Sequence, residues 1–254
     1  MSEIKDIKKH LHELRKRLFK IIISITIITI LILTLHINTD DYRNITIVYP
    51  TIEPFNNISI QLINHLKSKL IPENVELIQT SPGQAFFAQI HISLLIGTII
   101  TMPIILKEII DFMKPALHKN EIQLGRSISL PAAILFVIGC CFAYFVTIPY
   151  LLEFLYTYGQ YAGIMTFLNI TDFVTFVLQF LLAFGISFEL PLLMYATSKI
   201  GIVDKDFWTK NIRYSIVIIV IFGAVITPDG SGITMWLVSI PMILLYFIGI
   251  KIVK

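Results

Sequence analysis

Six strongly apolar stretches without aspartate, glutamate, lysine or arginine constrain this chain more than any other feature. They are Ile21–Thr39, Pro82–Leu106, Ser127–Leu152, Phe173–Phe188, Tyr214–Pro228 and Gly230–Ile250. About 20 helical residues, at ~1.5 Å each, cross a hydrocarbon core of roughly 30 Å. Four stretches approach that length, the fourth continues past Glu189 to Ser198, and the fifth is short. The fold class predicted is an all-α integral membrane protein, a bundle of six transmembrane helices.

The composition agrees with a membrane protein. Hydrophobic residues make up 56% of the chain and charged residues only 15%, with a mean hydropathy of +0.79. Soluble domains carry about 25% charged residues. An ordinary water-soluble enzyme is therefore excluded.

The positions of the basic residues predict the orientation. With the N-terminus in the cytoplasm, the inside segments hold seventeen of the twenty lysines and arginines, and the outside segments hold only Arg43, Lys67 and Lys69. Cytoplasmic loops are enriched in these residues, so both termini are predicted to be cytoplasmic (N-in/C-in) and the protein to lie in the cytoplasmic membrane.

The predicted organisation is a single membrane domain over residues 1–254. Its parts are a cytoplasmic interfacial helix at 1–20, transmembrane helices at 21–39, 82–112, 126–149, 173–198, 212–228 and 231–250, and a large extracytoplasmic loop at 40–81. Within that loop Ile58, Leu62, Leu66 and Leu70 recur every four residues. This pattern predicts a short amphipathic helix, either on the outer membrane surface or half-buried in the loop. Glycosylation is left open at three sequons that begin at Asn44, Asn57 and Asn169.

Motifs for catalysis and cofactor binding are not found in the sequence. His12-Glu13 begins like a zinc-protease motif, but Lys16 stands where the second histidine would be. No Gly-x-x-x-x-Gly-Lys nucleotide loop occurs, and Cys140 and Cys141 are too few for a metal site. We therefore expect no enzyme, no metal and no cofactor.

Several short motifs stand out in order along the chain. They are His10–Leu18, Ser81–Phe87, Met102–Ile104, Phe112–Glu121, Phe142–Phe145 with Pro149, Phe184–Pro191, and Ile226–Asp229 with Ile240-Pro241. Together these blocks resemble the TatC family, the polytopic core subunit of the twin-arginine protein translocase. The first of them, His-Leu-His-Glu-Leu-Arg-Lys-Arg-Leu, is similar to the family's opening motif. The resemblance extends from about residue 10 to residue 250.

The resemblance implies a function. TatC-like proteins recognise signal peptides with two adjacent arginines and, with small single-span TatA-type and sometimes TatB-type subunits, pass folded proteins across the membrane using the proton-motive force. The resemblance assigns Glu121 to signal-peptide binding and Phe112 to an aromatic contact in the same loop. It also implies self-association.

The residues support the recognition chemistry separately. A di-arginine ligand needs carboxylates at the cytoplasmic face, and Glu13 and Glu121 lie there among mostly basic residues. Taken without the family, the sequence favours Glu121 as a solvated loop acid paired with Lys119 or Arg126, and the resemblance reverses that preference. Arg15 and Arg17 are interpreted as positive-inside anchors touching lipid phosphate, with Arg15 a candidate organiser of Glu13.

Two prolines and one acid lie in the predicted helices. Pro103 and Pro191 each remove a backbone donor and should bend their helices into a concave bundle. Glu189 is expected in the bundle interior or in a polar pocket of the outer half of the membrane, with a functional role. It also leaves open a proton-coupled secondary transporter, whereas a purely structural scaffold would not need Glu13 and Glu121.

Overall fold

A computed structural model describes most of the chain. The described residues are 2–42, 45–72, 75–113, 119–161, 163, 167–201, 203–227 and 232–253. By backbone contacts they form two compact units. Unit 1 comprises Met1–Met102 and Leu155–Leu178, and unit 2 comprises Pro103–Phe154 and Gln179–Lys254.

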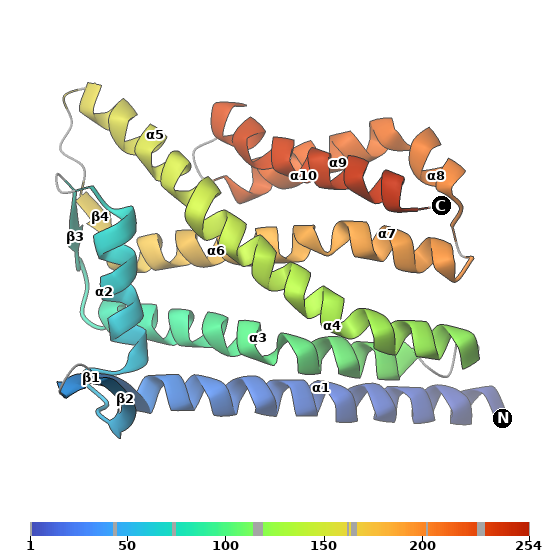
Figure 1. Cartoon of the computed structure of the whole chain (residues 1–254), viewed down its shortest axis with the longest axis horizontal. Coiled ribbons are helices and arrows are strands. Elements are labelled where there is room, and N and C mark those ends of the chain that lie inside the picture. Colours follow the sequence, from blue (N-terminus) through green and yellow to red (C-terminus); the bar gives the residue numbers. More distant parts are fainter. Residues whose placement is uncertain are drawn as a thin grey trace. The chain divides into compact units, whose positions relative to one another are not determined.

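Helices account for the six predicted spans. They are α1 (Ser2–Thr34), α3 (Gln84–Met113), α4 (Lys119–Phe142) continued by the π-helical η2 (Ala143–Thr147) and α5 (Ile148–Tyr161), α6 (Ile170–Phe188) with α7 (Leu190–Lys199), α9 (Ile212–Ile226), and α10 (Gly232–Ile252). Among the described residues five helical segments are long and apolar enough to cross a membrane, and α9 is a shorter apolar helix (Figure 1). The predicted six-helix membrane bundle is confirmed.

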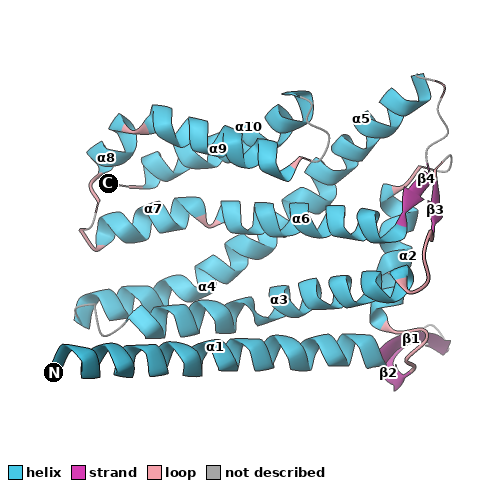
Figure 2. Cartoon of the chain, turned by 180° about the vertical axis from the view of Figure 1, so that it is seen from behind, coloured by secondary structure: helices cyan, strands magenta, loops and turns pink. Residues whose placement is uncertain are grey.

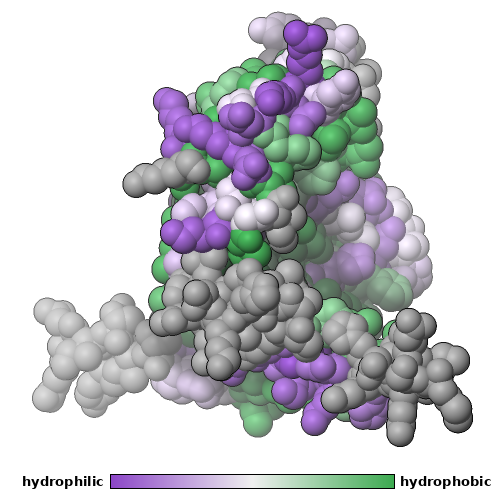
Figure 3. Space-filling view, turned by 90° about the vertical axis from the view of Figure 1, so that its right-hand side faces the viewer, coloured by the Kyte–Doolittle hydropathy of each residue, from purple (hydrophilic) through white to green (hydrophobic). Residues whose placement is uncertain are grey.

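The molecular surface is consistent with this class. Figure 3 looks onto one end of the helices and shows hydrophilic side chains (purple) next to broad apolar surface (green). Many large apolar side chains along the helices are exposed, including Phe19, Ile27, Phe145 and Val225. In a membrane protein this surface faces lipid, so its exposure carries no penalty.

In unit 1, α1 and α3 lie side by side and pack through small side chains (Figure 1). A Cβ atom added to Gly97 of α3 would lie 2.8 Å from Thr29 Oγ1 and 3.3 Å from the Ile25 carbonyl oxygen of α1. Ser93 and Thr101, one turn to either side of Gly97, are buried. Because lipid offers little hydrophobic drive to pair helices, close backbone approach at small residues supplies van der Waals contact instead.

Four short strands gather at one end of α1 and α3 in unit 1 (Figure 2). β1 (Leu35–Tyr42) pairs antiparallel with β2 (Ile45–Ile52), and β3 (Glu76–Ile78) pairs parallel with β4 (Phe167–Asn169). The first span was predicted to continue to Thr39, but α1 ends at Thr34. The following residues include His36 and Asn38, whose side chains are hydrogen-bonded to polar groups that a continued helix in lipid would not provide.

Helix α2 (Ile58–Leu70) confirms the predicted loop helix, and its packing distinguishes the two alternatives. Ile63, Leu66 and Leu70 are buried within the protein, which favours a half-buried loop helix over one lying on the membrane. Asn57 caps the helix by accepting a hydrogen bond from Ile60 N. Asn57 is only 1% exposed, so its sequon is inaccessible in the folded protein.

In unit 2, α4 and α6 approach closely at a glycine. A Cβ atom at Gly139 would lie 2.5 Å from the Phe184 carbonyl oxygen, so only glycine fits there. Phe142 extends the contact, with its ring centroid 5.6 Å from that of Phe184. The helical segments α7 and α10 also pack against each other, and α4 packs against α7.

The two prolines differ in their effect on the helices. Helix α3 continues through Pro103, whereas the fourth span is interrupted at Glu189, directly before the first turn of α7 that contains Pro191. Pro191 has no N–H to bond the Ser187 carbonyl, so the helix restarts there. The interruption places Glu189 between two helical segments.

Candidate functional site

Glu13 of α1 is paired with an arginine on its own helix. Arg17, four residues later, donates from Nη2 to Glu13 Oε1 at 2.5 Å and from Nε to the same oxygen at 3.2 Å. Arg15 had been considered the organiser of Glu13, but Arg15 is exposed and Arg17 makes the contact. Residues four apart lie on one helix face, whereas residues two apart point away from each other.

Phe112 and Glu121 belong to unit 2, at consecutive helix ends. Phe112 is partly exposed near the end of α3, and Glu121 is in the first turn of α4. The side chain of Glu121 and residues 114–118 lie outside the described residues. Because Glu13 belongs to unit 1, the structure describes the two parts of the predicted peptide site separately.

Two further acids lie on the same helical face as Phe112. Glu108 and Asp111 precede it by four residues and one residue, and Glu108 is only 7% exposed. The positions 108, 111 and 112 follow the i, i+3, i+4 spacing of one helix face. The sequence prediction did not single these acids out, although that spacing within the predicted second span was a usable signal.

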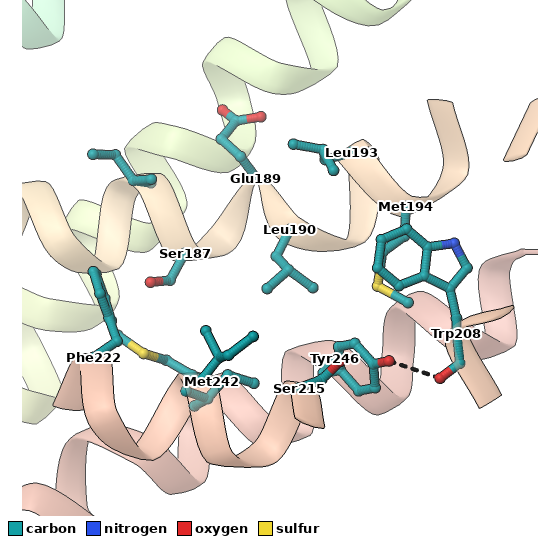
Figure 4. Close-up of a pocket in the computed structure, with 13 residues that line it drawn as sticks. Ser187, Glu189, Leu190, Leu193, Met194, Trp208, Ser215, Phe222, Met242 and Tyr246 are labelled. Atoms are coloured by element: carbon teal, nitrogen blue, oxygen red, sulfur yellow. Dashed lines mark hydrogen bonds between the residues drawn. The ribbon is translucent and has the colours of Figure 1, made fainter. Parts of the chain in front are cut away.

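Glu189 lies in unit 2 at the N-cap of α7 and lines a cavity of about 420 Å³. In Figure 4 its carboxylate points away from Met242 and Tyr246, whereas Leu190 points toward them. Most of the lining is apolar, with contributions from α6, α7, α8 (Lys205–Lys210), α9 and α10. This lining fits the bundle interior, the first of the two surroundings expected for Glu189. The depth of Glu189 in the membrane stays a prediction.

Three polar side chains that line this cavity form hydrogen bonds with other groups of the protein. Tyr246 donates its hydroxyl to the Trp208 carbonyl at 2.7 Å, and Trp208 Nε1 donates to Ser198 Oγ at 3.3 Å (Figure 4 shows the first bond). Ser187 donates to the Ala183 carbonyl of its own helix. Glu189 Oε1, in contrast, is buried without a hydrogen-bond partner among the described residues. A carboxylate in this state can accept a hydrogen bond from a polar group brought by another molecule.

Comparison with known proteins identifies the family. The family model described as "Sec-independent protein translocase protein (TatC)" matches residues 9–241. The chain belongs to the TatC family. A TatC protein of Cenarchaeum symbiosum is 53% identical over 249 residues, covering 98% of this chain and 94% of that protein. TatC of Escherichia coli K12 is 30% identical and covers 95% of this chain and 85% of its own length.

Solved structures give the same result. A crystal structure described as the twin arginine translocase receptor TatC superimposes with a TM-score of 0.75 at 33% identity, covering 96% of this chain and 97% of that chain. A second TatC crystal structure, obtained in DDM, superimposes with a TM-score of 0.78 at 32% identity. The chain is thus a multi-pass membrane component of the Tat (Sec-independent) protein translocase. TatC subunits serve transport and are not enzymes, as the sequence predicted.

Proposed function

We propose that this TatC protein recognises twin-arginine signal peptides at the cytoplasmic face and, with TatA-type subunits, transports folded proteins across the cytoplasmic membrane using the proton-motive force. Further TatC copies are also proposed as partners, and a TatB-type subunit is an optional addition to this set. The proposal includes the N-in/C-in orientation. The name of the solved relative, a twin arginine translocase receptor, supports peptide recognition by this family.

The observation that carries the proposal is the contact between Glu13 and Arg17. A carboxylate at the predicted cytoplasmic end of α1 accepts two bonds from a guanidinium group, which is the chemistry that an arginine of a signal peptide needs. Lysine cannot reproduce this planar fork. We propose that Glu13 and Glu121 together bind the arginine pair, with Phe112 packing beside it.

Peptide binding to the purified full-length protein tests recognition. Each charge-assisted pair should contribute about 1.5–3 kcal/mol, so Glu121→Gln should weaken binding of a twin-arginine peptide about tenfold or more. Phe112→Ala tests packing alone, and added salt should weaken the binding of the wild type. A peptide with two lysines in place of the two arginines is the control ligand. If Glu121→Gln binds the twin-arginine peptide as tightly as wild type at low salt, with the same preference over twin-lysine, the assignment is wrong.

Cysteine labelling tests the orientation. A reagent that cannot cross the membrane should modify cysteines placed at Ile60 and Gln160 from outside the cell, and should miss those at His118 and Lys205. Labelling at His118 from outside would overturn the topology and, with it, the cytoplasmic peptide site.

Glu189 is proposed to act in the transport step. It would accept a polar side chain of a partner subunit or take part in proton coupling, and its partnerless Oε1 supports this role. Glu189→Ala should reduce transport and crosslinking to a TatA-type subunit at an unchanged protein level. If transport, crosslinking and protein level are all unchanged, Glu189 has no such role.

A further inference from the structure

The hairpin formed by β1 and β2 has two chemically different faces close to α1. Residues paired directly across an antiparallel ladder share a face, and neighbours along a strand alternate. The pairs Leu35–Ile52 and Ile37–Pro50 therefore share one face, which is apolar over the part of the hairpin next to α1. The pairs His36–Thr51 and Asn38–Tyr49 form the opposite face, which is mainly polar.

Polar contacts fix the position of this hairpin in unit 1. His36 Nδ1 is hydrogen-bonded to the Asn56 carbonyl, and Asn38 Nδ2 donates to Thr51 Oγ1 at 2.9 Å. Gln61 of α2 donates to the Ile37 carbonyl at 2.9 Å and accepts from Ile37 N at 3.4 Å. The hairpin is therefore held against α2, and the orientation of its apolar face relative to α2 is fixed.

The apolar face is open in the described structure. Ile52 is 78% exposed, and Ile37 and Pro50 are also exposed. Phe55, three residues beyond the hairpin, is 94% exposed. A cluster of this kind on a surface facing water would be costly, because each side chain loses the benefit of burial.

The location of the hairpin indicates what covers this face. β1 begins directly after α1 ends at Thr34 (Figure 1). Glu53 N donates to the Thr34 carbonyl at 3.1 Å, so the end of β2 also lies next to the end of α1. The last turns of α1 expose Ile30 and Leu31, which face lipid in a spanning helix. The apolar face thus begins where the lipid-exposed residues of α1 end.

We propose that Ile37, Pro50, Ile52 and Phe55 form a lipid anchor that docks into the interfacial region of the leaflet at this end of α1, the extracytoplasmic leaflet in the predicted topology. Aromatic and apolar side chains favour this depth of a bilayer. Phe86 and Phe87, exposed on the first turns of α3 in the same unit, fit the same interfacial level. Lipid is favoured over a protein partner because the anchor is continuous with the exposed surface of α1.

The experiment measures the depth of single side chains in phosphatidylcholine vesicles. The full-length protein, with Cys140→Ala and Cys141→Ala, receives a nitroxide at Phe55→Cys or at Ile52→Cys. The matched control is Ser68→Cys on α2, also an exposed side chain of the same loop. Collision with oxygen, which concentrates in lipid, is compared with collision with a water-soluble nickel chelate. Circular dichroism confirms that each variant retains its helices.

The nitroxides at 52 and 55 should collide several-fold more with oxygen, relative to nickel, than the nitroxide at 68. If the probe at 55 meets nickel as often as the probe at 68, the face is in water and the proposal is wrong. If the probes at 52 and 55 are shielded from both reagents, a second copy or another protein covers the face, and the proposal is equally wrong.

Discussion

Asn57 and Glu189 are both polar residues next to apolar helices, and they differ in how completely their side chains are hydrogen-bonded. Asn57 Nδ2 lies 2.9 Å from the Leu33 and Pro54 carbonyl oxygens and 3.1 Å from Gln89 Oε1, and Asn57 Oδ1 accepts from Ile60 N and Ser59 Oγ. Glu189 Oε1 is buried without a hydrogen-bond partner in the described part of the chain. A saturated polar group stabilises the fold, whereas an unsatisfied one costs stability and is retained for another reason.

The largest effect is expected for Asn57→Ala. The substitution removes the cap of α2 and leaves the Leu33 and Pro54 carbonyl oxygens and Gln89 without this donor, at a cost on the order of 3 kcal/mol. Thermal unfolding in detergent, followed by circular dichroism, should shift down by roughly 6–12 °C. Ser68→Ala, at an exposed position of the same helix, should leave the midpoint unchanged. An unchanged midpoint for Asn57→Ala would show that the hydrogen bonds of Asn57 do not stabilise the fold, and the contrast with Glu189 would be wrong.

Glu189→Leu should have a smaller effect of the opposite sign. Replacing a partly buried acid whose Oε1 has no hydrogen-bond partner among the described residues should raise the free energy of unfolding by about 1 kcal/mol while transport is lost. The same thermal scan and a transport assay measure the two quantities. Glu153→Leu, at an exposed acid of α5, is the control and should stay within about 0.5 kcal/mol of wild type. A strong loss of stability on Glu189→Leu would show that Glu189 is structural, like Asn57.

The smallest effect is expected for Arg17→Gln, which tests whether an occupied acid can still bind a ligand. A helical pair at this spacing is worth about 0.3–0.5 kcal/mol, so removing the competition of Arg17 for Glu13 should tighten twin-arginine peptide binding about twofold. Titration at low salt measures this change, and Arg15→Gln should produce no gain. Weaker binding for Arg17→Gln would mean that Arg17 positions Glu13 instead of competing for it.

Much of the membrane architecture could be predicted because charge-free apolar runs are a strong signal. The six runs correspond to helices even where the span is short, as in α9. The ends were less predictable. The third span was predicted to end at residue 149, but α5 continues past Glu153 to Tyr161, because one charged residue ends an apolar run without ending a helix. The π-helical segment Ala143–Thr147 has no recognisable sequence signal.

The candidate site was predictable in its residue types and less so in its pairings. The preference of Glu13 for Arg17 over Arg15 follows from the four-residue spacing and could have been inferred. The helical periodicity of Ile58–Leu70 dominates the sequence of the outer loop and gives no sign of the hairpin, although Ile45–Ile52 is rich in the β-branched residues that favour strands. The apolar surroundings of Glu189 depend on five helical segments from distant parts of the chain, which no local pattern reveals.

The parallel pairing of β3 with β4 has a consequence for how the protein is made. Asn169, at the end of β4, donates to Thr80 from 89 positions farther along the chain. At roughly 5–20 residues per second, the ribosome needs about 5 to 20 seconds to add that length. During this interval β3 has emerged without its partner strand, and the first outer loop cannot be completed until the fourth span begins to insert. The order of membrane insertion therefore determines when this loop acquires its final structure.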